Sequence, residues 1–285
     1  VPGRPHSEGR NQRILDLANP EVQDFIITTM RRVFSSGEIS YVKWDMNRRH
    51  VQGSGAGGAA STSAQTHAVY RLIDELRTRF PKVEIESCAS GGGRIDLEIL
   101  RRVERVWTSD CNDALERQTI QQGASMLLPY EVMGAHIGPT RSHTTGRVHS
   151  LAFRGLTAMF GHLGVEWNVL KLTDDERAQL SAMIALHRRF RPLLHSGDAV
   201  RFDPVFNGQT IASHEYGVYS ADRTEALVAH VQLTTGLSLL PPPLRLLGLL
   251  PEALYTITHV PLPGSRLEWP ASGLALTGAQ LAGHG

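Results

Sequence analysis

The 285-residue chain is 41% hydrophobic, 20% charged and 6% aromatic. This composition is typical of a globular protein and excludes disorder as the main state, because enough apolar side chains are present to form a core. Lysines and arginines number 29 against 28 acidic residues, and the net charge of +1 argues against a broad nucleic-acid-binding surface. The sequence contains no run of 18 or more apolar residues, so no transmembrane helix is predicted. We therefore expect neither nucleic acid nor a membrane as a partner.

Cysteine and histidine usage indicates the compartment and bears on metal binding. The chain has two cysteines, Cys88 and Cys111, which cannot build a disulfide framework. The first residues lack the basic and apolar pattern of a signal peptide, so we expect a cytoplasmic protein. The 13 histidines include no His-Glu-x-x-His pair, and the cysteines form no Cys-x-x-Cys motif. We therefore expect no metal site and no bound cofactor.

Up to residue 195, short β-like runs alternate with longer helical runs. Apolar side chains recur at helical spacing over residues 20–34, which predicts the first helix. Residues 52–62 are rich in glycine and serine and predict a loop. The remaining predicted helices cover 63–79, 95–102, 112–127, 148–160 and 173–190. The predicted strands cover 39–44, 83–87, 105–109, 130–136 and a short segment near Val165.

Repeated βα units of this size predict a parallel sheet. About five such units fit into the first 195 residues. Eight units would close a (β/α)8 barrel, and a doubly wound open sheet is the alternative. The open sheet is disfavoured because no Gly-x-Gly-x-x-Gly motif follows a predicted strand.

Beyond Ser196 the pattern changes to short β-like runs separated by turns. Asn207-Gly208 is typical of a hairpin turn. We predict two domains, an α/β domain over 1–195 and a small antiparallel β domain over 196–285. The strands predicted in the second domain cover 200–206, 210–213, 215–220, 226–233 and 253–259.

The segment from Tyr41 to Arg48 contains the first candidate catalytic group. Residues two apart in a strand share a face, so Lys43 and Asp45 point the same way. Asp45 ends the predicted strand, where barrel folds hold their active sites. A neighbouring cation favours the ionised carboxylate, which suits a nucleophile. The alternative interpretation is a structural ion pair at a strand end.

The segment from Trp107 to Asp113 contains the second candidate. Asp110 ends a predicted strand just before a helix, where an aspartate often caps the helix. Asp113, with Glu116 three residues later, fits the capping position better. Asp110 is therefore a candidate for a catalytic role. The alternative interpretation is that Asp110 caps the helix.

A glycine-rich segment from Glu86 to Arg94 follows the strand predicted at 83–87. Its three consecutive glycines, 91–93, let backbone N–H groups approach a ligand closely. A phosphate-binding loop is the rival interpretation, but no Gly-Lys-Ser/Thr follows. Cys88 as a thiol nucleophile needs a histidine partner, and the general usage of cysteine favours a small, buried and inert side chain instead.

Two carboxylates at the ends of parallel strands, without a metal or cofactor motif, match the needs of glycoside hydrolysis. One acts as nucleophile or base and the other as proton donor. With these residues in place, the chain resembles glycoside hydrolase family 36, the bacterial α-galactosidases. The segments that carry the resemblance occur in family order over roughly residues 4–172: Glu8–Gln12, Lys43–Arg48, Glu86–Asp96, Trp107–Ala114 and Met133–His136.

The resemblance implies a retaining mechanism and a role for each matching residue. Asp45 matches the nucleophile that forms a galactosyl ester, and Asp110 matches the general acid that later becomes the general base. The positions at which the family binds galactose hydroxyls are matched by Arg10, Lys43, Cys88 and Gly91. Trp44 lies next to this group, and we assign it only a packing role.

Two departures from the family pattern lie at the rim of the implied site. Cys111 stands where the family has asparagine after the acid/base aspartate. Ala89-Ser90 stands where the family has Ser-Gly. We expect these changes to shift the substrate preference or to lower the rate.

The resemblance also implies the architecture, which is about units four to eight of a (β/α)8 barrel followed by part of a small antiparallel β domain. The chain is then expected to be a fragment. Its intact parent is expected to hydrolyse α-galactosides such as melibiose or raffinose and to assemble as a homotetramer. The fragment alone is expected to expose open sheet edges, to be poorly soluble and to have little activity.

Two other functions are compatible with the same residues. A galactosyltransferase of the raffinose or stachyose synthase type would share the covalent intermediate and pass galactose to a sugar instead of water. A non-catalytic sugar-binding remnant would bind galactose without turnover. The presence of Asp45, Asp110 and Lys43 argues against the remnant.

Overall fold

The computed structural model describes residues 8, 11–48, 50, 60–235, 243–263 and 272–283. Arg10 and most of the loop predicted at 52–62 lie outside these ranges. The chain forms two compact units, residues 1–110 and 111–285. Across the described ranges, no helix is both long and apolar enough to cross a membrane.

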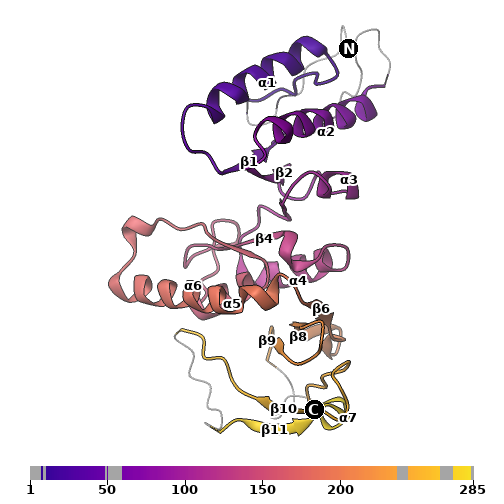
Figure 1. The fold of residues 1–285 in the computed structure, drawn as a ribbon. Coiled ribbons are helices and arrows are strands. Elements are labelled where there is room, and N and C mark those ends of the chain that lie inside the picture. Colours follow the sequence, from indigo (N-terminus) through magenta and orange to yellow (C-terminus); the bar gives the residue numbers. More distant parts are fainter. Residues whose placement is uncertain are drawn as a thin grey trace. The chain divides into compact units, whose positions relative to one another are not determined.

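Helices and parallel strands alternate in the first unit (Figure 1). The strands pair in the order β1-β2-β3, and both pairings are parallel. The helix predicted over 20–34 is confirmed at both ends; the side chain of Asn19 caps it and Pro20 occupies its first turn. The elements are α1 (Pro20–Phe34), β1 (Tyr41–Asp45), α2 (Thr62–Arg79), β2 (Glu84–Cys88), α3 (Leu97–Leu100) and β3 (Arg105–Trp107).

One face of this sheet packs against helices and forms an apolar core. Phe34 of α1 and Leu76 of α2 are buried together, and the ring of Phe34 meets Phe80 edge to face with centroids 5.0 Å apart. Val42 and Trp44 of β1 pack against this cluster. Trp44 therefore has the packing role expected of it, and the residues that alternate with it lie on the other face.

The second unit begins with three further helices and two parallel strands. Asp113 caps α4, because its side chain accepts hydrogen bonds from the backbone N–H groups of Leu115 (2.9 Å) and Glu116 (3.1 Å). The predicted capping role of Asp113 is confirmed. β4 pairs with β5 in parallel. The elements are α4 (Ala114–Ser125), η1 (Tyr130–Val132), β4 (Met133–Ile137), α5 (Leu151–Met159), β5 (His162–Val165), η2 (Val169–Lys171) and α6 (Asp174–Leu194).

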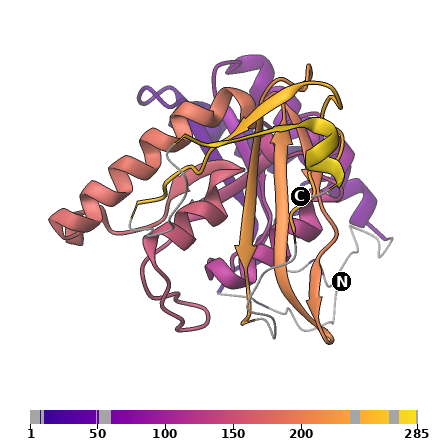
Figure 2. The same cartoon turned by 90° about the horizontal axis from the view of Figure 1, so that it is seen from below.

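Antiparallel strands follow from residue 198 onward. β8 is the long central strand and pairs with β6, β7 and β9; in Figure 2, β8 and β9 run side by side as the long orange strands. A second sheet pairs β10 with β11. The elements are β6 (Asp198–Arg201), β7 (Val205–Asn207), β8 (Thr210–Tyr219), β9 (Ala226–Gln232), β10 (Leu254–Ile257), β11 (Leu274–Thr277) and α7 (Gly278–Gly283).

Three details of this region differ from the sequence prediction. The strand predicted over 200–206 is two strands, β6 and β7, separated by residues that include Pro204, which has no N–H for a ladder. The runs predicted at 210–213 and 215–220 are one strand, because His214 is buried within β8 and does not mark a turn. β11 and α7 were not predicted. The hairpin signal at Asn207-Gly208 is confirmed, since Asn207 pairs with Thr210 across a turn that begins at Gly208, φ +62°.

Candidate active site

Lys43, Asp45 and Cys88, three of the residues predicted to carry the chemistry, lie on the face of the first unit's sheet that faces away from the apolar core. The face carries charged side chains along its length, and β3 extends it with Arg105, the register partner of Glu86. Its carboxyl-terminal edge is where active sites occur in parallel α/β folds. The parallel register of β1 and β2 places pairs on this face: Tyr41 with Glu84, Lys43 with Glu86 and Asp45 with Cys88.

Asp45, at the carboxyl end of β1, is exposed and surrounded by hydrogen-bond donors. Its carboxylate accepts bonds from the Cys88 thiol, the Asn47 amide and the backbone N–H of Ser90. Partial burial alone raises the pKa of Asp45, but these donors outweigh it and bring the pKa below its usual value. Asp45 is therefore ionised at neutral pH, as a nucleophile must be.

Cys88 follows from β2 as the direct register partner of Asp45. The side chain is 2% exposed, and burial together with the Asp45 carboxylate raises the pKa of the thiol to about 11. Cys88 is thus a protonated donor to Asp45 at neutral pH. This state disfavours the thiol-nucleophile interpretation, because the thiolate is the reactive form.

The glycine-rich loop after β2 packs closely against the loop that carries Asp110. Gly91 has φ +83°, and a Cβ there would lie 2.8 Å from Ser109 Cα and 3.0 Å from the Asp110 backbone nitrogen. Only glycine fits both the conformation and the space. Arg94 holds the loop by donating to the carbonyl oxygens of Trp44 (2.8 Å) and Cys88 (3.1 Å).

At the departure Ala89-Ser90, the backbone of Ser90 has an unusual conformation. Its φ is +49°, in the left-handed region that non-glycine residues rarely adopt. The family resemblance implies glycine at this position. The strain is local, and the same backbone conformation directs the Ser90 N–H to the Asp45 carboxylate.

Lys43 forms its ion pair with Glu86, directly across the strand pair. Lys43 Nζ lies 3.3 Å from Glu86 Oε1, and the same ammonium lies 4.2 Å from the ring centroid of Trp107. Tyr41 donates its hydroxyl to Glu86, and burial with this carboxylate raises the pKa of Tyr41. Hydrogen-bond donors, and not the Lys43 ammonium expected from the sequence, therefore keep the Asp45 carboxylate ionised.

Asp110 lies three residues beyond Trp107, in the loop after β3, and is exposed. Its Oδ1 accepts a hydrogen bond of 3.0 Å from Trp107 Nε1. The capping position of the next helix belongs to Asp113, so helix capping does not account for Asp110. An exposed carboxylate at the carboxyl end of a parallel strand is suited to exchange a proton with a substrate.

Sequence reasoning missed the supporting residues of this site. Glu86 and Trp107 lie within the segments that carry the family resemblance, but the sequence assigns them no role. Alternation places residues on a face only within one strand. The register of β1 and β2 is what sets Glu86 opposite Lys43. Arg10, the remaining predicted galactose-binding residue, lies outside the described residues. Within the described ranges, no group of three or more His, Cys, Asp or Glu side chains could hold a metal ion.

The second unit has a polar cluster of its own at the carboxyl ends of β4 and β5. Glu166 Oε2 accepts a bond of 2.6 Å from the Asn112 amide and lies 3.1 Å from His136 Nδ1. Cys111, the other departure from the family pattern, has its Sγ 3.7 Å from Thr144 Oγ1. Cys111 thus has a contact within the second unit, whereas the departure at Ser90 is a strained backbone position.

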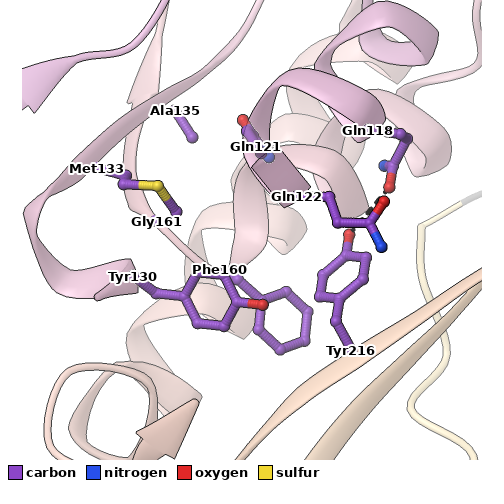
Figure 3. Close-up of a pocket in the computed structure, with 9 residues that line it drawn as sticks. All are labelled: Gln118, Gln121, Gln122, Tyr130, Met133, Ala135, Phe160, Gly161 and Tyr216. Atoms are coloured by element: carbon purple, nitrogen blue, oxygen red, sulfur yellow. Dashed lines mark hydrogen bonds between the residues drawn. The ribbon is translucent and has the colours of Figure 1, made fainter. Parts of the chain in front are cut away.

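A small cavity in the second unit lies between α4, β4 and β8 (Figure 3). Its volume is about 20 Å³, which is room for about one water molecule. Gln118 donates to Thr157 Oγ1 at 2.7 Å and accepts from the Tyr216 hydroxyl at 3.3 Å, the contact drawn in Figure 3. Gln121 donates to the Thr157 carbonyl at 2.7 Å. Gln118 and Gln121 thus make their hydrogen bonds within the protein, and the cavity is too small to hold a sugar.

Comparison with known proteins places this geometry in a family. The model of the Melibiase family matches residues 1–197. The chain is 45% identical over 267 residues to an α-galactosidase of Escherichia coli, covering 94% of this chain and 37% of that protein. It is 39% identical over 281 residues to the α-galactosidase AgaA of Geobacillus stearothermophilus, covering 97% of this chain and 38% of that protein.

Solved structures agree with these sequence relatives. The GH36 α-galactosidase AgaB of Geobacillus stearothermophilus superposes with a TM-score of 0.89 at 36% identity, covering 100% of this chain and 38% of that chain. The chain thus spans somewhat more than a third of the length of such relatives. The predicted fold class, part of a (β/α)8 barrel followed by a small antiparallel β domain, is confirmed, and so is the resemblance to glycoside hydrolase family 36. Because the family model matches more than half of its residues, the chain belongs to the Melibiase family.

Proposed function

We propose that this chain contains the two catalytic carboxylates of an α-galactosidase that releases terminal α-D-galactosyl residues with retention of configuration. Asp45 is the nucleophile and Asp110 is the acid/base. Lys43, Cys88, Gly91 and Arg10 bind the galactosyl group. The relatives named as α-galactosidases support the reaction class.

The observation that carries the proposal is the arrangement of donors around Asp45. The thiol of Cys88, the amide of Asn47 and the N–H of Ser90 converge on one carboxylate at the carboxyl edge of the parallel sheet. Donors to the charged form keep this group ionised and fix its orientation. A structural ion pair at a strand end does not require such a set, and Lys43 is paired with Glu86 instead.

In the first half of the reaction, an oxygen of Asp45 attacks the anomeric carbon of the galactosyl group. The bond from that carbon to the leaving-group oxygen breaks, and its electron pair goes to the oxygen as Asp110 donates a proton. A galactosyl ester of Asp45 results. The protonated Cys88 thiol next to Asp45 is a donor, and it does not compete as a nucleophile.

In the second half, Asp110 accepts a proton from water, and the water oxygen attacks the same carbon. The ester bond to Asp45 breaks and the carboxylate is restored. Two inversions give net retention.

Neighbours that hold ligands support a substrate class for the complete protein. Structures of AgaA variants were solved with raffinose and with stachyose, at TM-scores of 0.87 to this chain. We propose α-galactoside oligosaccharides of this kind, melibiose and raffinose among them, as substrates. Residues 1–195 would form the catalytic barrel part and 196–285 the antiparallel β domain. A cytoplasmic location and a homotetramer of the complete protein stay predictions.

The nucleophile assignment is tested with an activated fluorinated galactoside whose galactosyl-enzyme hydrolyses slowly. The protein expressed from the complete gene is expected to gain the mass of one fluorogalactosyl group, and peptide mapping is expected to locate it on Asp45. Proton NMR of the first product is expected to detect the α anomer. A first-formed β anomer would contradict the double displacement, and a label on another residue would contradict the assignment.

The two alternative functions are separated by the same preparation. Release of aryl alcohol that rises with an added sugar acceptor, together with an oligosaccharide product, would favour galactosyl transfer over hydrolysis. Galactose binding without release of aryl alcohol would favour a sugar-binding remnant.

A further inference from the structure

Trp107 is a buried residue that contacts both Asp110 and Lys43 of the proposed machinery. It ends β3 and is 3% exposed. Its indole nitrogen donates to Asp110 Oδ1 at 3.0 Å, and its ring lies under the Lys43 ammonium, 4.2 Å from the centroid. One side chain thus offers a hydrogen bond to the proposed acid/base and a π face to a proposed galactose-binding cation.

The N–H at the edge of the indole ring bears on which oxygen of Asp110 carries the proton. An indole N–H is a donor and cannot accept a hydrogen bond. Oδ1 accepts this 3.0 Å bond best as the unprotonated carbonyl oxygen, so the contact favours a proton on Oδ2 over one on Oδ1. The proton that Asp110 carries therefore belongs on Oδ2, and the indole also sets the plane in which Oδ2 is presented.

The face of the ring acts on Lys43. The ammonium lies between this face and Glu86 Oε1, 3.3 Å away. A cation over an aromatic face is held by the ring quadrupole, more strongly where water is excluded. These two partners hold the flexible lysine side chain in place, and one third of that side chain is exposed.

We propose that Trp107 is a positioning residue that selects Oδ2 as the proton-carrying oxygen of Asp110 and, through its face, sets the place of the Lys43 ammonium. The proposal rests on the proposed α-galactosidase function. It assigns a different measurable effect to each surface of the ring. Loss of the N–H acts on proton donation to the leaving group, and loss of the face acts on galactose binding.

The test uses two substitutions in the protein expressed from the complete gene. Trp107→Phe keeps an aromatic face toward Lys43 and removes the N–H, whereas Trp107→Leu removes both. Trp44→Phe is the matched control, because Trp44 lies on β1, packs in the apolar core and faces away from the site. Steady-state kinetics are measured on raffinose, whose leaving group needs a proton, and on a dinitrophenyl α-galactoside, whose leaving group does not. Thermal unfolding of every variant is measured alongside.

Trp107→Phe is expected to lower kcat/KM on raffinose by about tenfold or more while leaving kcat/KM on the dinitrophenyl substrate within about threefold. This ratio reports only the first half of the reaction, where general acid catalysis matters for the poor leaving group alone. Trp107→Leu is expected to add a rise in KM of about two- to fivefold on both substrates. Trp44→Phe is expected to leave the ratio between the two substrates unchanged.

The outcomes separate the two proposals. An inactive wild-type protein overturns the α-galactosidase function and this inference with it. If the wild type is active, two results overturn the positioning role alone. In one, Trp107→Phe lowers kcat/KM equally on both substrates. In the other, Trp107→Phe lowers kcat/KM no more than Trp44→Phe does. A folded Trp107→Leu variant whose KM equals that of Trp107→Phe overturns the role of the ring face.

Discussion

Two sheets of this protein contain a buried glutamate paired with a basic residue directly across the strands. In the parallel sheet, Glu86 of β2 pairs with Lys43 of β1, its register partner. In the antiparallel sheet, Glu215 of β8 pairs with His230 of β9, also its register partner, at 2.7 Å from Oε1 to Nδ1. The two pairs are similar in burial of the carboxylate and in lying directly across neighbouring strands, although the Glu86–Lys43 contact is longer, at 3.3 Å.

The surroundings of the two pairs differ. The Lys43 ammonium contacts Trp107, which in turn holds Asp110, while Glu215 has Ser213 as a further hydrogen-bond partner within its own strand. Strands of a parallel sheet all end at the same edge, so reactive groups at their ends gather there. Antiparallel strands end at alternate edges. We infer that strand direction decides whether such a pair lies in a reactive site, since both carboxylates are buried and both are paired directly across the strands.

The largest expected effect concerns the two aspartates at the edge of the parallel sheet. Asp45→Asn is expected to lower kcat by on the order of a thousandfold or more on every substrate, because an amide cannot form the ester. Asp110→Ala is expected to retain more activity on activated aryl galactosides, whose leaving groups need no proton. Steady-state kinetics on a leaving-group series measure both. Equal losses for the two variants on the activated substrate would contradict the assigned roles.

The next effect compares two glycines with positive φ, one in each region. Gly91→Ala is expected to destabilise the fold by more than about 2 kcal/mol and to reduce activity, because the new Cβ meets Ser109 Cα at 2.8 Å and displaces the Asp110 loop. Gly208→Ala in the β7–β8 turn has no neighbour within 4 Å and is expected to cost about 1 kcal/mol without loss of activity. Urea unfolding and aryl galactoside assays measure the two effects. Similar results for both variants would show that backbone conformation alone matters at Gly91.

The ion pairs themselves give the third test. Glu86→Gln removes the charge that holds Lys43, and kcat/KM is expected to fall by about tenfold, mostly through KM. Glu215→Gln removes the matching charge on β8 and is expected to leave KM and kcat unchanged. Michaelis–Menten kinetics on one aryl galactoside compare them. If the Glu86→Gln protein keeps the wild-type KM, the Lys43–Glu86 pair has no role in substrate binding.

The fourth test uses pH on the antiparallel pair. Burial alone raises the pKa of Glu215, but hydrogen bonds from His230 and Ser213 and the histidine charge lower it below its usual value. A depressed folded-state pKa contributes stability above the unfolded pKa, about 4.3, and this contribution is lost as the pH falls through the folded pKa. Wild type is therefore expected to exceed Glu215→Gln in unfolding free energy by about 1–3 kcal/mol at pH 6 and by less at pH 3. Chemical denaturation at both pH values gives the difference, and a pH-independent gap would contradict the linkage.

The smallest effect is expected at Ser90, in the loop that contacts Asp45. Ser90→Gly relieves a left-handed conformation at φ +49°. The gain is partly offset by the greater freedom of glycine in the unfolded chain, so stability is expected to rise by up to about 1 kcal/mol with kcat unchanged. Thermal unfolding measures the gain. A destabilised variant would mean that the Ser90 side chain makes a contact that outweighs the strain.

Local sequence patterns predicted most elements of this chain. The helix at 20–34, the alternating strands of the first 195 residues and the Asn207-Gly208 hairpin each depend on periodicity or turn chemistry within a few residues. The prediction failed at His214, where burial in a central strand overrode the polar character of the side chain. It also missed β11 and α7, whose packing depends on partners distant in sequence: Leu281 of α7 is buried with Tyr219 and Leu249.

The sequence by itself determined the candidates Asp45, Cys88 and Asp110, because strand ends and motif order are local properties. Only the tertiary structure decided how these groups are controlled. Register across β1 and β2 gave Asp45 a thiol donor and gave Lys43 a partner in Glu86, forty-three residues away in the chain. The contact of Trp107 with both Lys43 and Asp110 has the same origin. Hydrogen bonds and ion pairs across strands depend on which residues become neighbours in space, and no local pattern specifies that.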